Sequence, residues 1–352
     1  MKLINTRDAV GMVLCHDITQ IIKGVTKDAV FRKGHIVTEE DIPVLLSVGK
    51  DQLYVWEKEE GMLHENEAAE ILCRMCINEH MTRSQAKEGK IELRADRDGL
   101  LKVDRAALKA VNGFGQMMIA SRHGNFAVKK GDKLAGTRII PLVIEEEKMM
   151  AAEEACMQAS GGQPIFTILP FHSKRVGIVT TGNEVYYGRI QDTFTPVIEE
   201  KIGEFDSRMC WHEVLNDDDK KVTAAILRMI EEGADLVCCT GGMSVDPDDK
   251  TPLAIKNTGA RIVSYGAPVL PGAMFMLAYY EKEEAGEKKV VPIVGLPGCV
   301  MYSKRTIFDL VLPRLMADDE VTAEELSALG EGGFCLNCPQ CTFPNCGFGK
   351  GK

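Results

Sequence analysis

The hydrophobic and polar positions of the chain are patterned most clearly between residues 174 and 316. This pattern predicts strands at residues 176–180, 208–215, 236–240 and 261–265, and a hairpin from 273–280 to 290–295. Helices are predicted after Thr195, after Asp217, after Thr251 and over residues 300–316. Strands that alternate with helices at this spacing form βαβ units. Residues 173–318 are therefore predicted to be an α/β, three-layer domain with a mostly parallel sheet.

The rest of the chain has weaker patterning and divides into three parts. Residues 1–60 predict a small, mixed α+β N-terminal region, with a turn at Lys33-Gly34, a helix opened by Thr38 and a strand at residues 52–56. Residues 61–172 predict a mixed accessory domain and linker. It has helices near 64–80 and 145–159, a charged and turn-rich stretch at 82–110, and short β-like runs over 115–144. Residues 319–352 form a cysteine-rich tail.

Composition and charge argue against two kinds of partner, nucleic acids and membranes. The formal net charge of −10 argues against a nucleic-acid partner, which needs a clustered basic face. Residues 1–10 hold no apolar run that would indicate a signal peptide, and the longest apolar stretch, 267–280, is too short to span a bilayer. The chain is therefore expected in the cytoplasm, with no membrane partner. Most of its twelve cysteines lie among apolar neighbours, as reduced core thiols do.

Unusual loops follow the predicted strands. In an open parallel sheet, ligands bind beyond the carboxyl ends of the strands. The loops there are residues 181–192, 241–251, 268–272 and 296–298; all four contain glycine, and the first two also carry acidic residues. Glycine lets backbone approach a ligand closely, and exposed amides suit phosphate. Carboxylates beside that phosphate require a cation such as Mg²⁺ between them, so the loops predict a phosphorylated ligand and a metal.

These loops also carry a family resemblance. Residues 180–184, 240–252, 271–272 and 296–298 resemble the molybdopterin-binding domain. Molybdopterin molybdenumtransferases, molybdopterin adenylyltransferases, gephyrin and competence-damage proteins share that domain. The resemblance implies that molybdopterin, in its pterin dithiolene or adenylylated form, binds across the loops.

Matching positions imply roles for individual residues. Asp249, Asp192 and Glu184 are expected to be the catalytic acids, with Asp192 and Asp249 holding Mg²⁺ and the acids positioning molybdate. The residues expected to contact phosphate or pterin are Thr181, Gly182, Asn183, Thr240, Gly241, Gly242, Ser244, Pro271, Gly272, Pro297 and Gly298. The chain departs from the family pattern at Asn183, Phe194 and Cys299.

The N-terminal residues 11–18 and 31–56 resemble the molybdenumtransferases, which favours a transferase. The first hypothesis is Mg²⁺-dependent insertion of molybdate into adenylylated molybdopterin with release of AMP. The second is a non-catalytic carrier or sensor that hands the finished cofactor to apo molybdenum enzymes. A third, the adenylylating step, has no separate nucleotide-binding loop in the sequence to support it. The family resemblance also implies a homodimer.

Four cysteines crowd into the tail, at Cys335, Cys338, Cys341 and Cys346. A short segment after Gly332-Gly333 cannot build a core, so the thiols need another reason. Metal ligation, by Zn²⁺ or a [4Fe–4S] cluster, is the favoured interpretation. Redox-active or merely reduced thiols are the alternative, and sulfur or metal exchange with the dithiolene is a weaker one.

Overall fold

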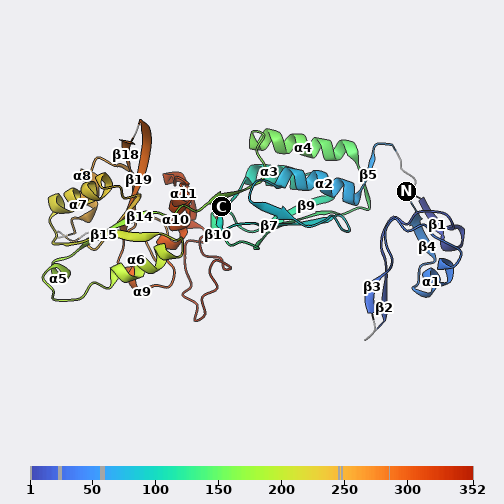
Figure 1. Ribbon diagram of the computed structural model, residues 1–352, viewed down its shortest axis with the longest axis horizontal. Helices are drawn as coiled ribbons and strands as arrows, with labels where there is room; N and C mark the ends of the chain where they lie inside the picture. Colours follow the sequence, from blue (N-terminus) through green and yellow to red (C-terminus); the bar gives the residue numbers. More distant parts are fainter. Residues whose placement is uncertain are drawn as a thin grey trace. The chain divides into compact units, whose positions relative to one another are not determined.

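The computed structural model describes residues 2–22, 26–55, 60–244, 246, 249–284 and 286–351 (Figure 1). The chain divides into two compact units. One comprises Met1–Arg97, Val103–Arg122 and Lys130–Ile168, and the other comprises Asp98–Lys102, His123–Lys129 and Leu169–Lys352. The cysteine-rich tail therefore groups with the α/β unit.

The second unit is built on a six-stranded sheet with the order β15-β14-β16-β19-β18-β17. The strands are β14 (Arg175–Thr181), β15 (Arg208–Leu215), β16 (Leu236–Thr240), β17 (Arg261–Tyr265), β18 (Met276–Glu284) and β19 (Glu287–Leu296). Strands β15, β14, β16 and β19 pair in parallel, whereas β18 is antiparallel to both of its neighbours. The predicted α/β fold with a mostly parallel sheet is confirmed.

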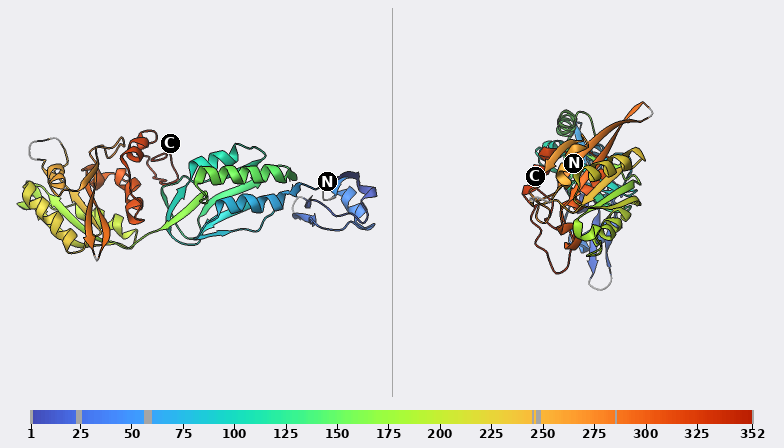
Figure 2. Two further views of the ribbon diagram at one scale, coloured as in Figure 1. Left: turned by 90° about the horizontal axis from the view of Figure 1, so that it is seen from above. Right: turned by 90° about the vertical axis from the view of Figure 1, so that its left-hand side faces the viewer.

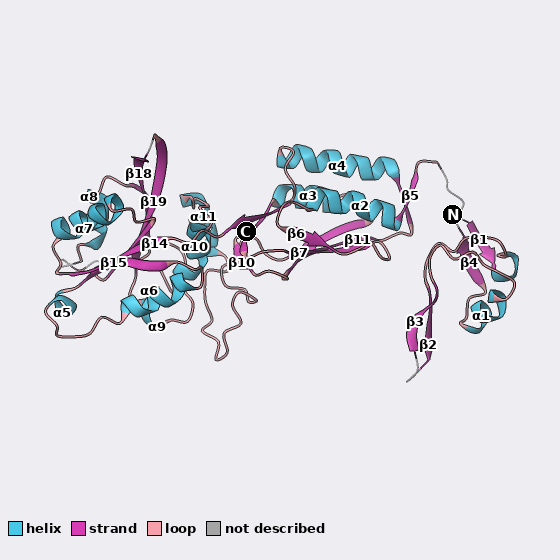
Figure 3. Cartoon of the chain, viewed as in Figure 1, coloured by secondary structure: helices cyan, strands magenta, loops and turns pink. Residues whose placement is uncertain are grey.

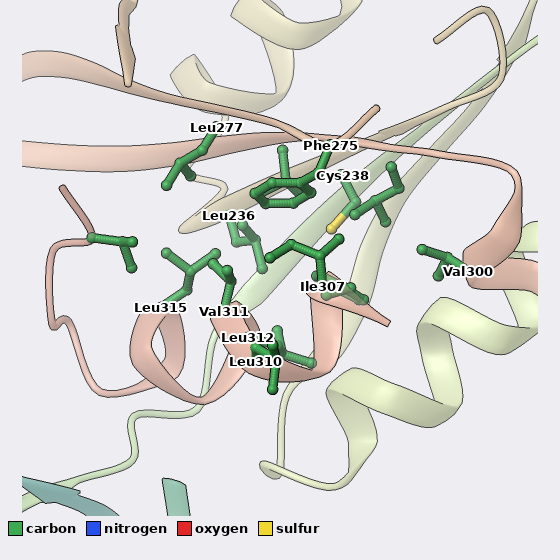
Figure 4. Close-up of a cluster of buried hydrophobic side chains, with 14 of the residues drawn as sticks. Leu236, Cys238, Phe275, Leu277, Val300, Ile307, Leu310, Val311, Leu312 and Leu315 are labelled. Carbon is green, nitrogen blue, oxygen red and sulfur yellow. The ribbon is translucent and has the colours of Figure 1, made fainter. Parts of the chain in front are cut away.

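Helices cover both faces of this sheet. Helices α7 (Asp219–Glu231) and α8 (Thr251–Asn257) pack on one face, and α6 (Phe194–Gly203), α9 (Cys299–Tyr302) and α10 (Ile307–Met316) pack on the other. Strand β16 shows why both faces need a covering layer. All five of its residues are buried, and their side chains alternate between the two faces of the sheet. Cys238 faces α10, with Phe275 and Ile307 nearby in Figure 4, and Cys239 faces α7. The result is the predicted three-layer arrangement.

Local capping explains where the helices begin. The Asp218 carboxylate accepts the amides of Lys220 and Lys221 at the start of α7. The predicted helix over 300–316 is instead two helices, because Thr306 and Asp309 form a capping box that starts α10 afresh. Helix α6 begins at Phe194, one residue before the predicted start at Thr195.

The β18–β19 hairpin is longer than predicted. The charged residues expected at its tip pair as strand, with Glu281 opposite Val290 and Lys282 opposite Lys289. Lys289 also reaches Asp235, its Nζ lying 2.8 Å from the carboxylate. Long charged side chains are compatible with strand pairing when they point to solvent or reach a partner, which composition alone does not reveal.

The first unit is mixed α and β (Figures 2 and 3), as predicted. Its strands and helices within residues 2–55 are β1 (Lys2–Asn5), η1 (Thr6–Asp8), β2 (Ile18–Ile22), β3 (Thr26–Phe31), α1 (Asp41–Ser47) and β4 (Gln52–Val55). Helix α1 begins at Asp41 rather than at Thr38, whose amide the Asp41 carboxylate accepts. Trp56, the end of the last predicted strand, lies outside the described residues.

Farther along this unit, helices cover one side of an antiparallel sheet with the order β6-β7-β11-β9. The sheet strands are β6 (Met81–Arg83), β7 (Lys90–Ala95), β9 (Met117–Ser121) and β11 (Lys133–Ile139). The helices are α2 (Glu65–Cys76), α3 (Arg105–Asn112) and α4 (Glu146–Ser160), and α4 packs against the other two. The short strands β5 (Met62–His64) and β12 (Val143–Glu145) pair with each other in this unit. Strands β8 (Gly99–Val103), β10 (Phe126–Val128) and β13 (Phe166–Pro170) form a separate three-stranded sheet with the order β10-β8-β13. Residues 98–102 and 123–129 of that sheet group with the second unit.

The stretch 82–110 was predicted as turn-rich, and this was wrong. It contains β7, β8 and α3. Ile91, Leu93 and Ala95 are buried on alternate positions of β7, and Asp104 caps α3 by accepting the amide of Ala107. The charged residues between the buried positions make the composition of this stretch look like that of a loop. The alternation of apolar and polar residues that is typical of a strand is nevertheless present in the sequence. None of the helices in the described part of the chain is long and apolar enough to cross a membrane.

Candidate functional site

A cavity of about 620 Å³ opens at the carboxyl edge of the sheet in the second unit. Loops after β16 and β19 reach this edge directly, and the loop before β18 reaches it because β18 runs antiparallel. The residues that line the cavity are Phe194, Gly241, Gly242, Met243, Ser244, Asp246, Asp249, Leu270, Pro271, Gly272, Ala273, Met274, Leu296, Pro297, Gly298, Cys299 and Tyr302. Its volume is in the range of small-molecule sites.

The loop after β16 needs its two glycines. Gly241 and Gly242 have φ of +80° and +54°, and a Cβ on Gly241 would lie 2.0 Å from the Thr181 carbonyl oxygen. The Thr251 hydroxyl donates to the Gly241 carbonyl at 2.8 Å, and its amide donates to the Gly242 carbonyl at 3.2 Å. Thr181 supports the loop from behind, with its Oγ1 3.0 Å from the Thr251 Oγ1. These hydrogen bonds hold the backbone of Gly241 and Gly242 in place where it lines the cavity.

Two carboxylates lie on the cavity wall in the same loop, those of Asp246 and Asp249. The Asp246 amide donates to Asp249 Oδ2 at 3.2 Å, and the Asp249 amide donates to the Asp246 carbonyl at 2.9 Å. The Tyr265 hydroxyl donates to the Met243 carbonyl at 2.9 Å and so holds the start of the loop. Burial raises the pKa of Tyr265, and the charge of Asp249 adds to the rise. Val245, Pro247 and Asp248 of this loop lie outside the described residues.

Other lining residues come from the loop before β18 and from the loop after β19. Gly272 has φ of +133°, and a Cβ there would lie 2.4 Å from Ile307 Cγ2, so the loop is packed directly on α10. The Ile307 amide donates to the Pro271 carbonyl at 3.1 Å. After β19, Pro297 and Gly298 turn the chain into α9. Close packing of this kind fixes the position of the loop before β18 on α10.

Asp192 is used differently. Its Oδ1 accepts the amides of Phe194 and Thr195 at 2.9 and 3.1 Å, and its Oδ2 accepts the hydroxyls of Thr195 and Thr180 at 2.6 and 3.1 Å. His212 Nε2 lies 3.3 Å from the same Oδ2. Burial alone would raise the pKa of Asp192, but the hydrogen bonds from Thr195, Phe194 and Thr180 outweigh it and lower the pKa. Asp192 starts α6 and is not among the residues lining the cavity.

The structure gathers part of the predicted site on the cavity. The predicted residues that line it are Gly241, Gly242, Ser244, Asp249, Pro271, Gly272, Pro297 and Gly298. Thr181 and Thr240 lie behind the loop, and Thr240 Oγ1 is buried without a hydrogen-bond partner among the described atoms. Gly182, Asn183 and Glu184 lie at the start of α5 (Asn183–Tyr186), outside the lining.

Sequence reasoning missed several lining residues. Phe194, Met243, Met274 and Tyr302 give the cavity apolar and aromatic wall that the glycine and acid pattern did not indicate. Two of the lining residues, Phe194 and Cys299, had been noted as departures from the family pattern. Such departures were therefore a signal in the sequence that could have pointed to them. His212 had no signal in the sequence, because only the parallel pairing of β15 with β14 brings it beside Asp192.

A second cavity, of about 440 Å³, is lined by all four tail cysteines. Pro271 lines both cavities. Within the described ranges, no three His, Cys, Asp or Glu side chains stand close enough together to hold a metal ion as they are placed. The metal interpretation of the tail thus stays a prediction at this stage.

The fold and the cavity define a class: a three-layer α/β domain whose glycine-rich loops line a cavity of small-molecule size at the carboxyl edge of the sheet. Residues 177–317 match the family described as "Probable molybdopterin binding domain", which confirms the resemblance found in the loop motifs. Residues 3–57 match "Domain of unknown function (DUF8806)".

Curated relatives match only in part. A CinA-like protein of Mycobacterium tuberculosis is 35% identical over 79 residues, which is 22% of this chain and 18% of that protein. A CinA-like protein of Mycobacterium avium is 25% identical over 167 residues, which is 40% of this chain and 38% of that protein. The chain thus spans well under half the length of these relatives.

Solved structures are also similar to part of the chain. The tungsten cofactor synthesizing protein MoaB from Pyrococcus furiosus is 21% identical with a TM-score of 0.32, covering 41% of this chain and 88% of that one. The molybdopterin biosynthesis enzyme MoaB from Thermus thermophilus is 22% identical with a TM-score of 0.31, covering 40% of this chain and 91% of that one.

Proposed function

We propose that the α/β domain binds molybdopterin, in its adenylylated form, in the 620 Å³ cavity and acts in molybdenum cofactor biosynthesis. One observation carries the proposal. Glycine-rich backbone from three separate loops and the carboxylates of Asp246 and Asp249 meet on a single cavity. Open backbone amides suit the phosphates of such a ligand, and the apolar wall at Phe194 and Tyr302 suits its ring systems.

The proposed reaction is the Mg²⁺-dependent insertion of molybdate with release of AMP. Asp246 and Asp249 fit Mg²⁺, because hard carboxylate oxygens together with ligand phosphates are the set this ion prefers. When bound there, Mg²⁺ would neutralise charge on the pyrophosphate as its phosphorus–oxygen bond breaks. The chain's own contribution is positional: Thr181 and Thr251 hold the glycine backbone, and Tyr265 anchors the acidic segment.

A carrier that binds the finished cofactor without turnover is the second candidate, and Asp192 favours it. Four hydrogen bonds already occupy both oxygens of this carboxylate, and Glu184 lies outside the cavity lining. Two of the three expected catalytic acids are therefore not among the residues that line the cavity. A carrier needs the cavity but not those acids.

Binding and turnover are separated by one set of measurements. Purified chain is titrated with adenylylated molybdopterin, with and without Mg²⁺, and in a separate arm with the finished molybdenum cofactor. AMP is then measured after molybdate is added to the complex with the adenylylated form. The enzyme hypothesis expects tight, Mg²⁺-dependent binding and AMP release, both weakened in Asp249→Asn. The carrier hypothesis expects tight binding of the finished cofactor and no AMP release.

Asp206→Asn is the matched control. Asp206 is an exposed residue of the same unit with φ of +54°, a conformation that asparagine tolerates. The Asp206→Asn variant should bind the pterin with the same affinity as the wild-type chain. Failure of the wild-type chain to bind either form of the pterin would reject both candidates.

A further inference from the structure

The cysteine segment at the end of the chain is a loop that is fastened at both ends. At its start, the Leu270 amide donates to the Gly333 carbonyl and the Cys335 amide donates to the Leu270 carbonyl, each at 2.8 Å. At its end, the Gly349 amide donates to the Gly332 carbonyl at 3.0 Å, and Phe348 is buried in the α/β core. The segment between these ties therefore has a fixed place on the domain.

Between the two ties the loop has no core of its own. Residues 336–342 are all exposed, and residues 335–346 contain neither helix nor strand. Leu336 is 76% exposed, as an apolar side chain would be in a loop that lacks internal packing. Ordering such a loop costs backbone entropy, and a cross-link within the loop would offset that cost.

Four thiols are available for that cross-link. Cys335, Cys338, Cys341 and Cys346 all line the 440 Å³ cavity, and none is in a disulfide. Two other cysteines show the contrast, because Cys238 and Cys239 are fully buried in β16 and serve as core residues. In the tail, Cys335 and Cys346 are partly buried against the α/β core, whereas Cys338 and Cys341 are exposed.

The surroundings of the thiols suit a group of net negative charge. Lys304 and Arg305 line the same cavity, and the Lys304 ammonium donates to the Pro339 carbonyl at 2.9 Å. The Arg305 guanidinium lies over the Phe343 ring, 5.0 Å from its centroid. Four thiolates around Zn²⁺ or around a [4Fe–4S]²⁺ cluster carry a net charge of about −2. Lys304 and Arg305 reduce that charge, Arg305 by less because its guanidinium also pairs with the Asp309 carboxylate at 2.8 Å.

We infer that the four tail cysteines bind a thiophilic metal centre beside the ligand cavity. Each thiol loses its proton on binding, and the four thiolates close the loop around the metal. The loop must draw its thiols together to do so, and it can because no helix or strand has to break.

The proposed metal centre lies next to a loop that lines the ligand cavity. Leu270 lines the ligand cavity and accepts the Cys335 amide, and Pro271 lines both cavities. Metal binding therefore tightens the loop that forms one wall of the ligand site. This inference stands on the tail and its contacts, and it does not require that the ligand be a pterin.

Metal content tests the inference directly. The full chain is purified without oxygen, and zinc, iron and acid-labile sulfide are measured, followed by two loading arms with Zn²⁺ alone or with Fe²⁺ and sulfide. We expect one zinc ion or one four-iron cluster per chain, and the two arms identify which. The double variant Cys338→Ser, Cys341→Ser should lose at least about tenfold in metal affinity.

The controls keep this test decisive. Cys210→Ser removes an exposed thiol on β15, outside the tail, and should retain the metal. Circular dichroism should show the double variant folded, because both of its thiols are exposed. A wild-type chain that takes up metal in neither arm, or a double variant that keeps as much as the wild type, overturns the inference. None of these measurements uses a pterin, so they fail independently of the proposed function.

Hydrogen exchange tests the link to the ligand cavity. The amides of Leu270 and Cys335 should exchange more slowly in the metal-loaded chain than in the metal-free chain. Unchanged exchange at both amides would show that the metal centre and the cavity wall are independent.

Discussion

Two loops leave the same edge of the sheet, one after β14 and one after β16, and they use their acidic residues in opposite ways. The loop after β16 holds glycine backbone and Asp249 against the cavity. The loop after β14 turns Asp192 toward Thr180 and Thr195, where its carboxylate starts a helix. Equivalent positions at a sheet edge therefore need not have equivalent roles, and hydrogen bonding distinguishes them.

The largest expected effect concerns the glycines of the two loops. Gly241→Ala should lower the free energy of unfolding by about 3–5 kcal/mol, from the positive φ and the contact with the Thr181 carbonyl. Gly188, in the other loop, has φ of +67° and open space around it, so Gly188→Ala should cost only about 1–2 kcal/mol. Urea unfolding of both variants measures the difference. Equal costs would mean that the close approach in the β16 loop is unimportant.

The next effect concerns Asp192. Asp192→Asn should lower the free energy of unfolding by about 1–2 kcal/mol near neutral pH, because charged hydrogen bonds are lost. The folded pKa of Asp192 lies below its unfolded value of about 3.9, so its contribution is present above that pH and is lost as pH falls through the folded pKa. Unfolding curves at several pH values should show the gap between wild type and variant closing in acid. A gap that persists unchanged there would contradict the assignment.

Asp249→Asn should show the opposite behaviour. Its unfolding free energy should stay within about 0.5 kcal/mol of the wild type. Its affinity for adenylylated molybdopterin in the presence of Mg²⁺ should fall by about tenfold, since a carboxylate on the cavity wall is lost. Calorimetric titration measures both this variant and Asp192→Asn. The contrast between the loops fails if Asp192→Asn loses more affinity than Asp249→Asn.

The smallest effect concerns the anchor of the β16 loop. Tyr265→Phe removes the hydroxyl that donates to the Met243 carbonyl and should cost about 0.5–1 kcal/mol of stability. Tyr187→Phe, at an exposed tyrosine in the other loop, should cost less than that. Thermal unfolding of the pair is sufficient to rank them, and the reverse ranking would argue against an anchoring role.

The sequence predicted the fold of the second unit well because its strands are short apolar runs buried on both faces, as β16 is. It predicted the first unit less well, because strand β7 carries charged residues between its buried positions. It located the loops of the site but not the direction of their side chains. Asp192 and Asp249 looked alike in the sequence, and only their hydrogen-bond partners separate them.

The paired cysteines of β16 give the domain an internal reporter. Burial raises the pKa of Cys239 to about 12 and that of Cys238 well above its ordinary value. A protonated, sealed thiol does not react with alkylating reagents, so these two become modified only when the central strand opens. In a metal-free chain the exposed Cys338 and Cys341 react from the folded state. The alkylation rate of Cys338 and Cys341 would thus report the accessibility of the tail in the folded chain. The alkylation rate of Cys238 and Cys239 would report the opening of the sheet in the same molecule.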